Sequence, residues 1–118
     1  MDKKALIRQY KETRRPMGVF QVRNTVDGKV FIGVSVDLPA MLNRQQSQLR
    51  MGGHPNKELQ KAWNEFGAEA FEFEVLDTLT PSDRHYDPKD DLKALEDLWL
   101  DKLSPYDERG YNVRKRTG

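Results

Sequence analysis

The sequence predicts one α+β domain, a three-stranded antiparallel sheet flanked by helices, with an extra helix at the N-terminus. Its 118 residues are near the commonest length of a single domain. Two segments rich in β-branched and aromatic residues surround an Asp-Gly pair at residues 27–28, which is a strong hairpin signal. Two helical segments, a strand that alternates apolar and charged residues, and a last helix follow this hairpin.

The chain begins with a short amphipathic segment. Residues 2–14 hold a few apolar residues among charged ones, which predicts a helix ending before Pro16. We therefore expect residues 1–16 to form a helical extension that precedes the main domain. The hairpin strands are expected at residues 18–24 and 29–34.

Two helices are predicted between the hairpin and the third strand. Asp37 is expected to cap the first, which runs to about Met51, where two glycines stop it. Asn56 is expected to cap the second, which Gly67 ends. Three apolar side chains of the second helix have i, i+4 and i+7 spacing and are expected to face the core: Leu59, Trp63 and Phe66.

The remaining elements complete a domain over residues 17–113. Residues 71–75 alternate strictly, which predicts a strand with Phe71, Phe73 and Val75 inward. A helix is expected over residues 90–103, followed by a short extended piece and a basic tail at 114–118.

The charge is unevenly distributed although the net charge is only +1. Residues 1–64 carry twelve Lys and Arg against five Asp and Glu, whereas residues 65–108 carry four against fourteen. The acidic part has an ordinary explanation as a solubilising surface. The basic half offers arginines for phosphate binding: Arg14, Arg15, Arg23, Arg44 and Arg50.

Some classes of protein are excluded. The chain has no cysteine, so it forms neither disulfides nor thiolate metal sites. No apolar run is long enough to span a membrane, and no signal-peptide core follows Met1. We therefore expect a cytoplasmic protein that does not interact with membranes.

One carboxylate lies where the core of the last helix is expected. Leu92, Leu95, Trp99 and Leu103 form an inward-facing stripe, and at 100° per residue Glu96 falls inside it. Burying an ionised carboxylate costs several kcal/mol unless a cation or donors compensate. Glu96 is therefore either a residue at the rim of the stripe that pairs with an arginine such as Arg44, or a metal-binding or acid/base group.

Several short motifs occur in the order found in the GIY-YIG nuclease superfamily, and the chain resembles this family over about 95 residues. The later part resembles the phage homing-endonuclease branch. The resemblance rests on these segments: Gly18-Val19-Phe20, Phe31-Ile32-Gly33, His54…Asn56…Leu59-Gln60…Phe66-Gly67…Phe71, Glu96-Asp97-Leu98-Trp99 and Gly110-Tyr111-Asn112.

The resemblance implies cleavage of DNA phosphodiesters with one divalent metal, Mg²⁺ or Mn²⁺. It places the metal-binding glutamate at Glu96 and supporting residues at Asn112 and His54. It also implies two tyrosines and an arginine in the site. These fall on three residues that lack the required hydroxyl or guanidinium groups: Phe20, Phe31 and Met41.

Substitutes for the missing groups are few. Arg44 lies one turn beyond Met41 on nearly the same helix face. His54 has an ordinary pKa near neutrality, which suits a general base, but it also fits an exposed loop residue beside Pro55. Loss of a general base typically costs 10²–10⁴-fold in rate, and loss of a charge-stabilising donor about 10²–10³-fold.

Three functions remain open from the sequence. The first is a nuclease-like domain with impaired catalysis that binds DNA weakly and without sequence specificity. The second is an active metal-dependent endonuclease with a rearranged site. The third is a protein-interaction module whose contact surface is the N-terminal helix or the acidic face.

Overall fold

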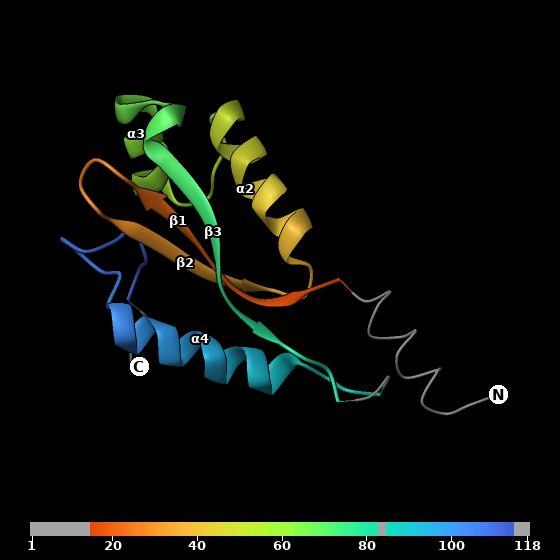
Figure 1. Cartoon of the computed structure of the whole chain (residues 1–118). Coiled ribbons are helices and arrows are strands. Elements are labelled where there is room, and N and C mark those ends of the chain that lie inside the picture. Colours follow the sequence, from red (N-terminus) through yellow and green to blue (C-terminus); the bar gives the residue numbers. More distant parts are fainter. Residues whose placement is uncertain (1–14, 83–84, 115–118) are drawn as a thin grey trace.

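The computed structural model describes residues 15–82 and 85–114. Its elements follow in the order β1 (Met17–Asn24), β2 (Val30–Ser35), α2 (Leu38–Met51), α3 (Lys57–Phe66), η1 (Ala68–Ala70), β3 (Phe71–Leu79) and α4 (Lys89–Leu103), as Figure 1 shows. The helix expected over residues 2–14 lies outside the described residues. Within the described part, no helix has the length and apolar character needed to cross a membrane.

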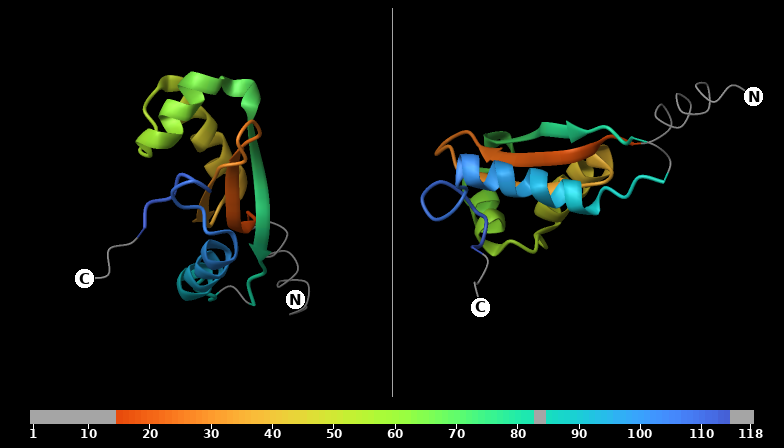
Figure 2. Two further views of the ribbon diagram at one scale, coloured as in Figure 1. Left: turned by 90° about the vertical axis from the view of Figure 1, so that its left-hand side faces the viewer. Right: turned by 90° about the horizontal axis from the view of Figure 1, so that it is seen from below.

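The three strands form one antiparallel sheet in the order β2-β1-β3, so the first strand is central. Helices α2 and α3 cover one face of the sheet and α4 covers the other (Figure 2). The predicted α+β architecture with a three-stranded antiparallel sheet is thus confirmed.

The helix boundaries follow from the predicted caps. Asp37 Oδ1 accepts a hydrogen bond from the Ala40 amide at 3.2 Å, and Asn56 Oδ1 accepts one from the Leu59 amide at 2.9 Å. Gly52 ends α2 with a φ of 78°, a left-handed conformation that glycine adopts without steric cost. These local signals were therefore read correctly from the sequence.

Gly18 lies where β3 approaches β1 most closely. A Cβ atom on this residue would overlap the Asp77 carbonyl oxygen and lie 2.7 Å from Thr78 Cα. The β1–β3 register shifts beside it, between Val19 and Phe20. Because the obstructing atoms are backbone, only glycine fits this position without disrupting the strand pair.

The sheet has apolar side chains on both faces. Phe20 and Val22 belong to the cluster under α2 and α3, whereas Val19 points to the α4 side of the sheet. Two inward predictions were wrong: Phe66 is 38% exposed and Val75 is 47% exposed. Phe66 is the last residue of α3, and Val75 lies on the edge strand β3, so neither is covered on all sides.

The C-terminal segment lies along the β2 edge of the sheet. Gly110 forms a parallel bridge with Val30, and the Tyr111 amide donates to the Val30 carbonyl at 2.9 Å. The predicted extended piece is therefore paired with a strand. This pairing brings Asn112 to the same edge.

Candidate active site

Phe20, Phe31 and Met41, the three departures from the family motifs, lie together on the α2 side of the sheet. Phe20 is 2% exposed, and its ring meets Phe31 edge-on with 6.5 Å between centroids. Phe31 and Met41 are half-buried against the same cluster. Apolar groups thus occupy the positions where the resemblance implies two hydroxyls and a guanidinium.

Gly33 makes room for this arrangement. It pairs with Phe20 across the β1–β2 ladder, and a Cβ atom would lie 2.7 Å from Phe20 Cζ. The phenylalanine ring therefore lies directly over the glycine backbone. This contact explains why the second motif keeps its glycine although the tyrosines are absent.

His54 is buried beside the apolar cluster, with 6% of its surface exposed. Its ring meets Phe31 edge-on at 5.6 Å between centroids. Nδ1 accepts a hydrogen bond from the Asn56 amide at 3.0 Å. Nε2 therefore carries the proton in the neutral ring and donates to Gln45 Oε1 at 2.5 Å. The interpretation of His54 as an exposed loop residue is wrong.

The surroundings of His54 favour its neutral form. The residues that face it from β2, α2, the following loop and α3 are uncharged: Phe31, Gln45, Asn56 and Gln60. Burial lowers the pKa of His54. Both ring nitrogens are used within the protein, so the geometry gives His54 a structural role and leaves it no free nitrogen to act as a general base.

Asn112 is likewise held by the backbone. Its Nδ2 donates to the Ile32 carbonyl and its Oδ1 accepts from the Ile32 amide, both at 2.9 Å. The side chain thus imitates one more strand residue along the edge of β2. These two side-chain hydrogen bonds hold the C-terminal segment against β2, next to Phe31.

A polar network that the sequence reasoning missed joins the hairpin to the C-terminal segment. The Asn24 amide donates to the buried Tyr111 hydroxyl at 3.1 Å, and Asn56 Nδ2 donates to the Tyr111 carbonyl at 2.6 Å. Burial raises the pKa of Tyr111. The partners lie 87 and 55 residues away along the chain, so local sequence spacing carried no signal for these contacts.

Glu96 lies within the inward stripe of α4, as its helical spacing predicted. It is half-buried, whereas Asp97 and Asp101 are exposed. Among the described residues no hydrogen bond or ion pair involves its carboxylate, and Arg44 belongs to α2, which covers the other face of the sheet. The alternative in which Glu96 pairs with Arg44 is therefore not observed.

The fit of a metal ion to this carboxylate follows from ligand chemistry. In the part of the chain that the structure describes, there is no group of three or more His, Cys, Asp or Glu that could hold a metal. Mg²⁺ commonly binds one or two carboxylates, several waters and substrate phosphates, and Mn²⁺ also prefers oxygen ligands. Glu96 fits either ion only together with water and phosphate oxygens.

The candidate residues are thus divided between the two faces of the sheet. Phe20, Phe31, Met41 and His54 lie under α2 and α3, whereas Glu96 lies on α4. Asn112 is anchored at the edge of β2, where these two faces of the sheet meet.

The candidate phosphate-binding arginines differ in whether a carboxylate already binds their guanidinium group. Arg14 lies outside the described residues. Arg15 lies 3.9 Å from Asp37, and Arg23 forms ion pairs with Glu72 at 2.5 Å and Glu74 at 3.4 Å. The hydrogen bond to Glu72 is the largest cause of a raised pKa at Arg23. Two exposed arginines of α2 have no carboxylate partner among the described residues: Arg44 and Arg50.

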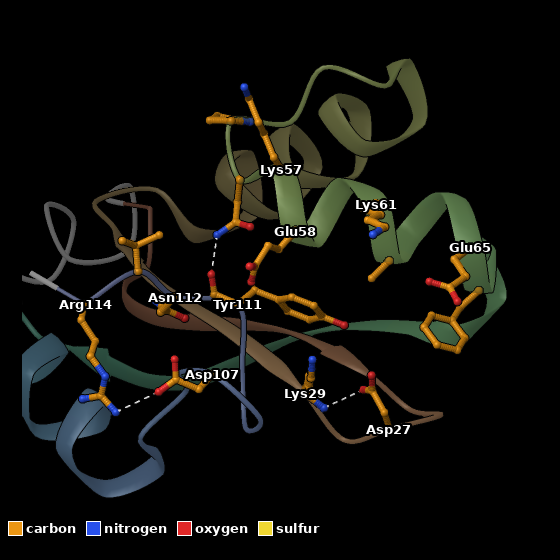
Figure 3. A pocket seen from close by; sticks show the side chains of 15 residues that line it. Asp27, Lys29, Lys57, Glu58, Lys61, Glu65, Asp107, Tyr111, Asn112 and Arg114 are labelled. Atoms are coloured by element: carbon orange, nitrogen blue, oxygen red, sulfur yellow. Dashed lines mark hydrogen bonds and ion pairs between the residues drawn. The ribbon is translucent and has the colours of Figure 1, made fainter.

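An open groove of about 920 Å³ lies between α3, the hairpin turn and the C-terminal segment (Figure 3). Tyr111 lies in its centre, and Lys29 approaches that ring at 5.8 Å. Basic and acidic side chains are equally numerous around it: Lys29, Lys57, Lys61 and Arg114 against Asp27, Glu58, Glu65 and Asp107. The groove therefore carries no net charge that would select a nucleic acid.

Comparison with known proteins agrees with the sequence resemblance. No family model matches the chain. It is 29% identical over 100 residues to Intron-associated endonuclease 1 of Enterobacteria phage T4. That alignment covers 85% of this chain and spans 38% of the relative's length.

Two solved structures are similar to the whole described fold. One is the catalytic domain of the homing endonuclease I-TevI, with a TM-score of 0.71, 28% identity, and coverage of 84% of this chain and 99% of that chain. The other is a mutant of the same domain, with a TM-score of 0.70, 26% identity, and coverage of 86% and 97%. The similarity extends over the sheet and its flanking helices.

Proposed function

Since the chain is a nuclease-type domain of the GIY-YIG homing-endonuclease kind, we propose that it binds nucleic acid but is impaired in cleaving it. The observation that supports this most is the apolar cluster of Phe20, Phe31 and Met41. Phenylalanine neither accepts nor relays a proton, and methionine carries no charge for a phosphate. His54, whose ring contacts Phe31, does not supply the missing proton acceptor, because both of its ring nitrogens are used within the protein.

The nucleic-acid part of the proposal is supported by charge. Arg44 and Arg50 are exposed and unpaired among the described residues, so they are available to phosphates. Non-specific binding to DNA depends mainly on such contacts and weakens steeply with salt. This proposal does not require a metal ion.

A second candidate function rests on Glu96. Its half-buried carboxylate without a partner among the described residues is suited to holding Mg²⁺ or Mn²⁺ with a substrate phosphate. When bound there, a metal would polarise the phosphoryl group. Arg44 would then stabilise the phosphate in place of Met41, and the protein would be an active endonuclease with a rearranged site.

The test combines a binding and a cleavage measurement on the full chain. We expect fluorescent duplex DNA to bind in low salt with an affinity that falls as salt rises. In Mg²⁺ or Mn²⁺, we expect the wild-type protein to nick supercoiled plasmid no faster than the Glu96→Ala variant does. Absence of binding to single-stranded, duplex and branched DNA would overturn the proposal, whereas nicking abolished by Glu96→Ala would support the second candidate.

A further inference from the structure

The outer face of α2 differs from the other charged surfaces of the molecule because it contains no carboxylate. From residue 38 to residue 57 the chain has no Asp or Glu, although it has 19 of them in all. The exposed and half-buried polar side chains of this helix are neutral or basic: Asn43, Arg44, Gln46, Ser47, Gln48 and Arg50.

The arginines of this face also have no carboxylate partner among the described residues, a property that they share with the exposed Arg109 but not with the other described arginines. Elsewhere in the described chain, Arg15, Arg23 and Arg114 lie within 4 Å of a carboxylate. Arg44 and Arg50 have no such partner among the described residues. A guanidinium that no protein carboxylate occupies keeps its planar set of donors for a phosphate.

The opposite side of the sheet has the reverse charge. The strand β3 and the helix α4 together carry eight acidic residues and three basic ones: Glu72, Glu74, Asp77, Asp90, Asp91, Glu96, Asp97 and Asp101 against Lys89, Lys93 and Lys102. Like charge repels a phosphate backbone from this side. The groove beside α3 has equal numbers of basic and acidic side chains, so its charge neither attracts nor repels a phosphate backbone.

We infer that nucleic acid binds through its phosphate backbone to the outer face of α2, with Arg44 and Arg50 as the principal contacts. This inference rests on the nucleic-acid binding proposed above and assigns it to one face. Arg23, which the sequence suggested, is excluded because two glutamates neutralise it. Single-stranded and duplex DNA share the phosphate chemistry, so both are included in the test.

The test compares two double variants of equal charge change in the full chain. One is Arg44→Gln with Arg50→Gln, and the matched control is Lys89→Gln with Lys93→Gln on α4. All four positions are exposed, and circular dichroism checks that both variants fold. Affinity for labelled 20-mer single-stranded and duplex DNA is measured between about 0.05 and 0.3 M salt.

The α2 variant is expected to bind at least about tenfold more weakly at 0.1 M salt, with the logarithmic salt slope for duplex DNA reduced by about 1.8, since each phosphate contact contributes about 0.9. The control is expected to bind as the wild type does, or slightly more weakly, because it loses the same amount of positive charge without losing a phosphate contact. If the α2 variant binds DNA as tightly as the wild type does, this inference is overturned and the proposed function is unaffected. Absence of wild-type binding would overturn both.

Discussion

His54 provides the most direct test of the packing beside the apolar cluster. Its replacement by alanine removes the partners of Gln45 Oε1 and of the Asn56 amide, and it removes the edge contact with Phe31. Each unsatisfied buried group costs about 1–3 kcal/mol and the ring contact about 0.5–1.5 kcal/mol. We expect His54→Ala to lower the free energy of unfolding by about 3–5 kcal/mol, a large part of the total for a domain of this size.

Urea unfolding at pH 7.5, followed by tryptophan fluorescence, measures this loss. His85→Ala is the matched control, because His85 is exposed and its replacement is expected to cost under about 1 kcal/mol. If His54→Ala does not fold, His54→Gln keeps a polar side chain at the position and is expected to lose less stability.

The pH dependence follows from the lowered pKa of His54. The unfolded chain binds a proton at His54 near its ordinary pKa of about 6.5, whereas the folded protein holds the ring neutral to lower pH. The stabilising contribution is therefore complete above about pH 6.5 and is lost as the pH falls towards the folded-state pKa. We expect the wild type to lose stability between pH 7 and pH 5 more steeply than His54→Ala. Equal slopes, or a cost below 1 kcal/mol at pH 7.5, would refute the neutral, buried assignment.

Two further predictions concern the backbone around the site. Gly18→Ala is expected to lower the free energy of unfolding by at least about 3 kcal/mol, because its Cβ would overlap the β3 backbone. Gly28→Ala is expected to cost only about 1–2 kcal/mol, because Gly28 has a φ of 81° but open space around it. Urea unfolding measures both variants, and equal costs would contradict the close approach of β3 to Gly18. Asn112→Ala is expected to lower the free energy of unfolding by about 2–4 kcal/mol, because both of its side-chain hydrogen bonds to Ile32 are lost. Amide hydrogen exchange at Ile32 is expected to become faster, and unchanged exchange there would contradict the anchoring role.

The elements were predictable because their signals are local. Asp37 and Asn56 lie next to the helices they cap, and the hairpin has its turn residues between its strands. The half-buried position of Glu96 also followed from spacing within one helix. Structural features that depend on residues close together in the chain could therefore be predicted from the sequence.

The composition of the site was less predictable because it depends on contacts between distant segments. The burial of His54 comes from partners on α2, α3 and β2, and nothing in the spacing around Pro55 indicates them. The side of the sheet that α4 covers is likewise not encoded in its own amphipathic pattern. The sequence therefore suggested which residues belong to the motifs, but not that the helix carrying Glu96 and the cluster containing Phe31 lie on opposite faces of the sheet.

Restoring the missing groups tests the central claim most directly. The triple variant Phe20→Tyr, Phe31→Tyr and Met41→Arg returns two hydroxyls and one guanidinium to the apolar cluster. The measurement is the rate of supercoiled-plasmid nicking in Mg²⁺ or Mn²⁺. If these three positions impair catalysis, the variant nicks at least about 10²-fold faster than the wild type, and adding Glu96→Ala abolishes the gain. A wild type that already nicks as fast as the variant, or a folded variant with no gain, would contradict the account.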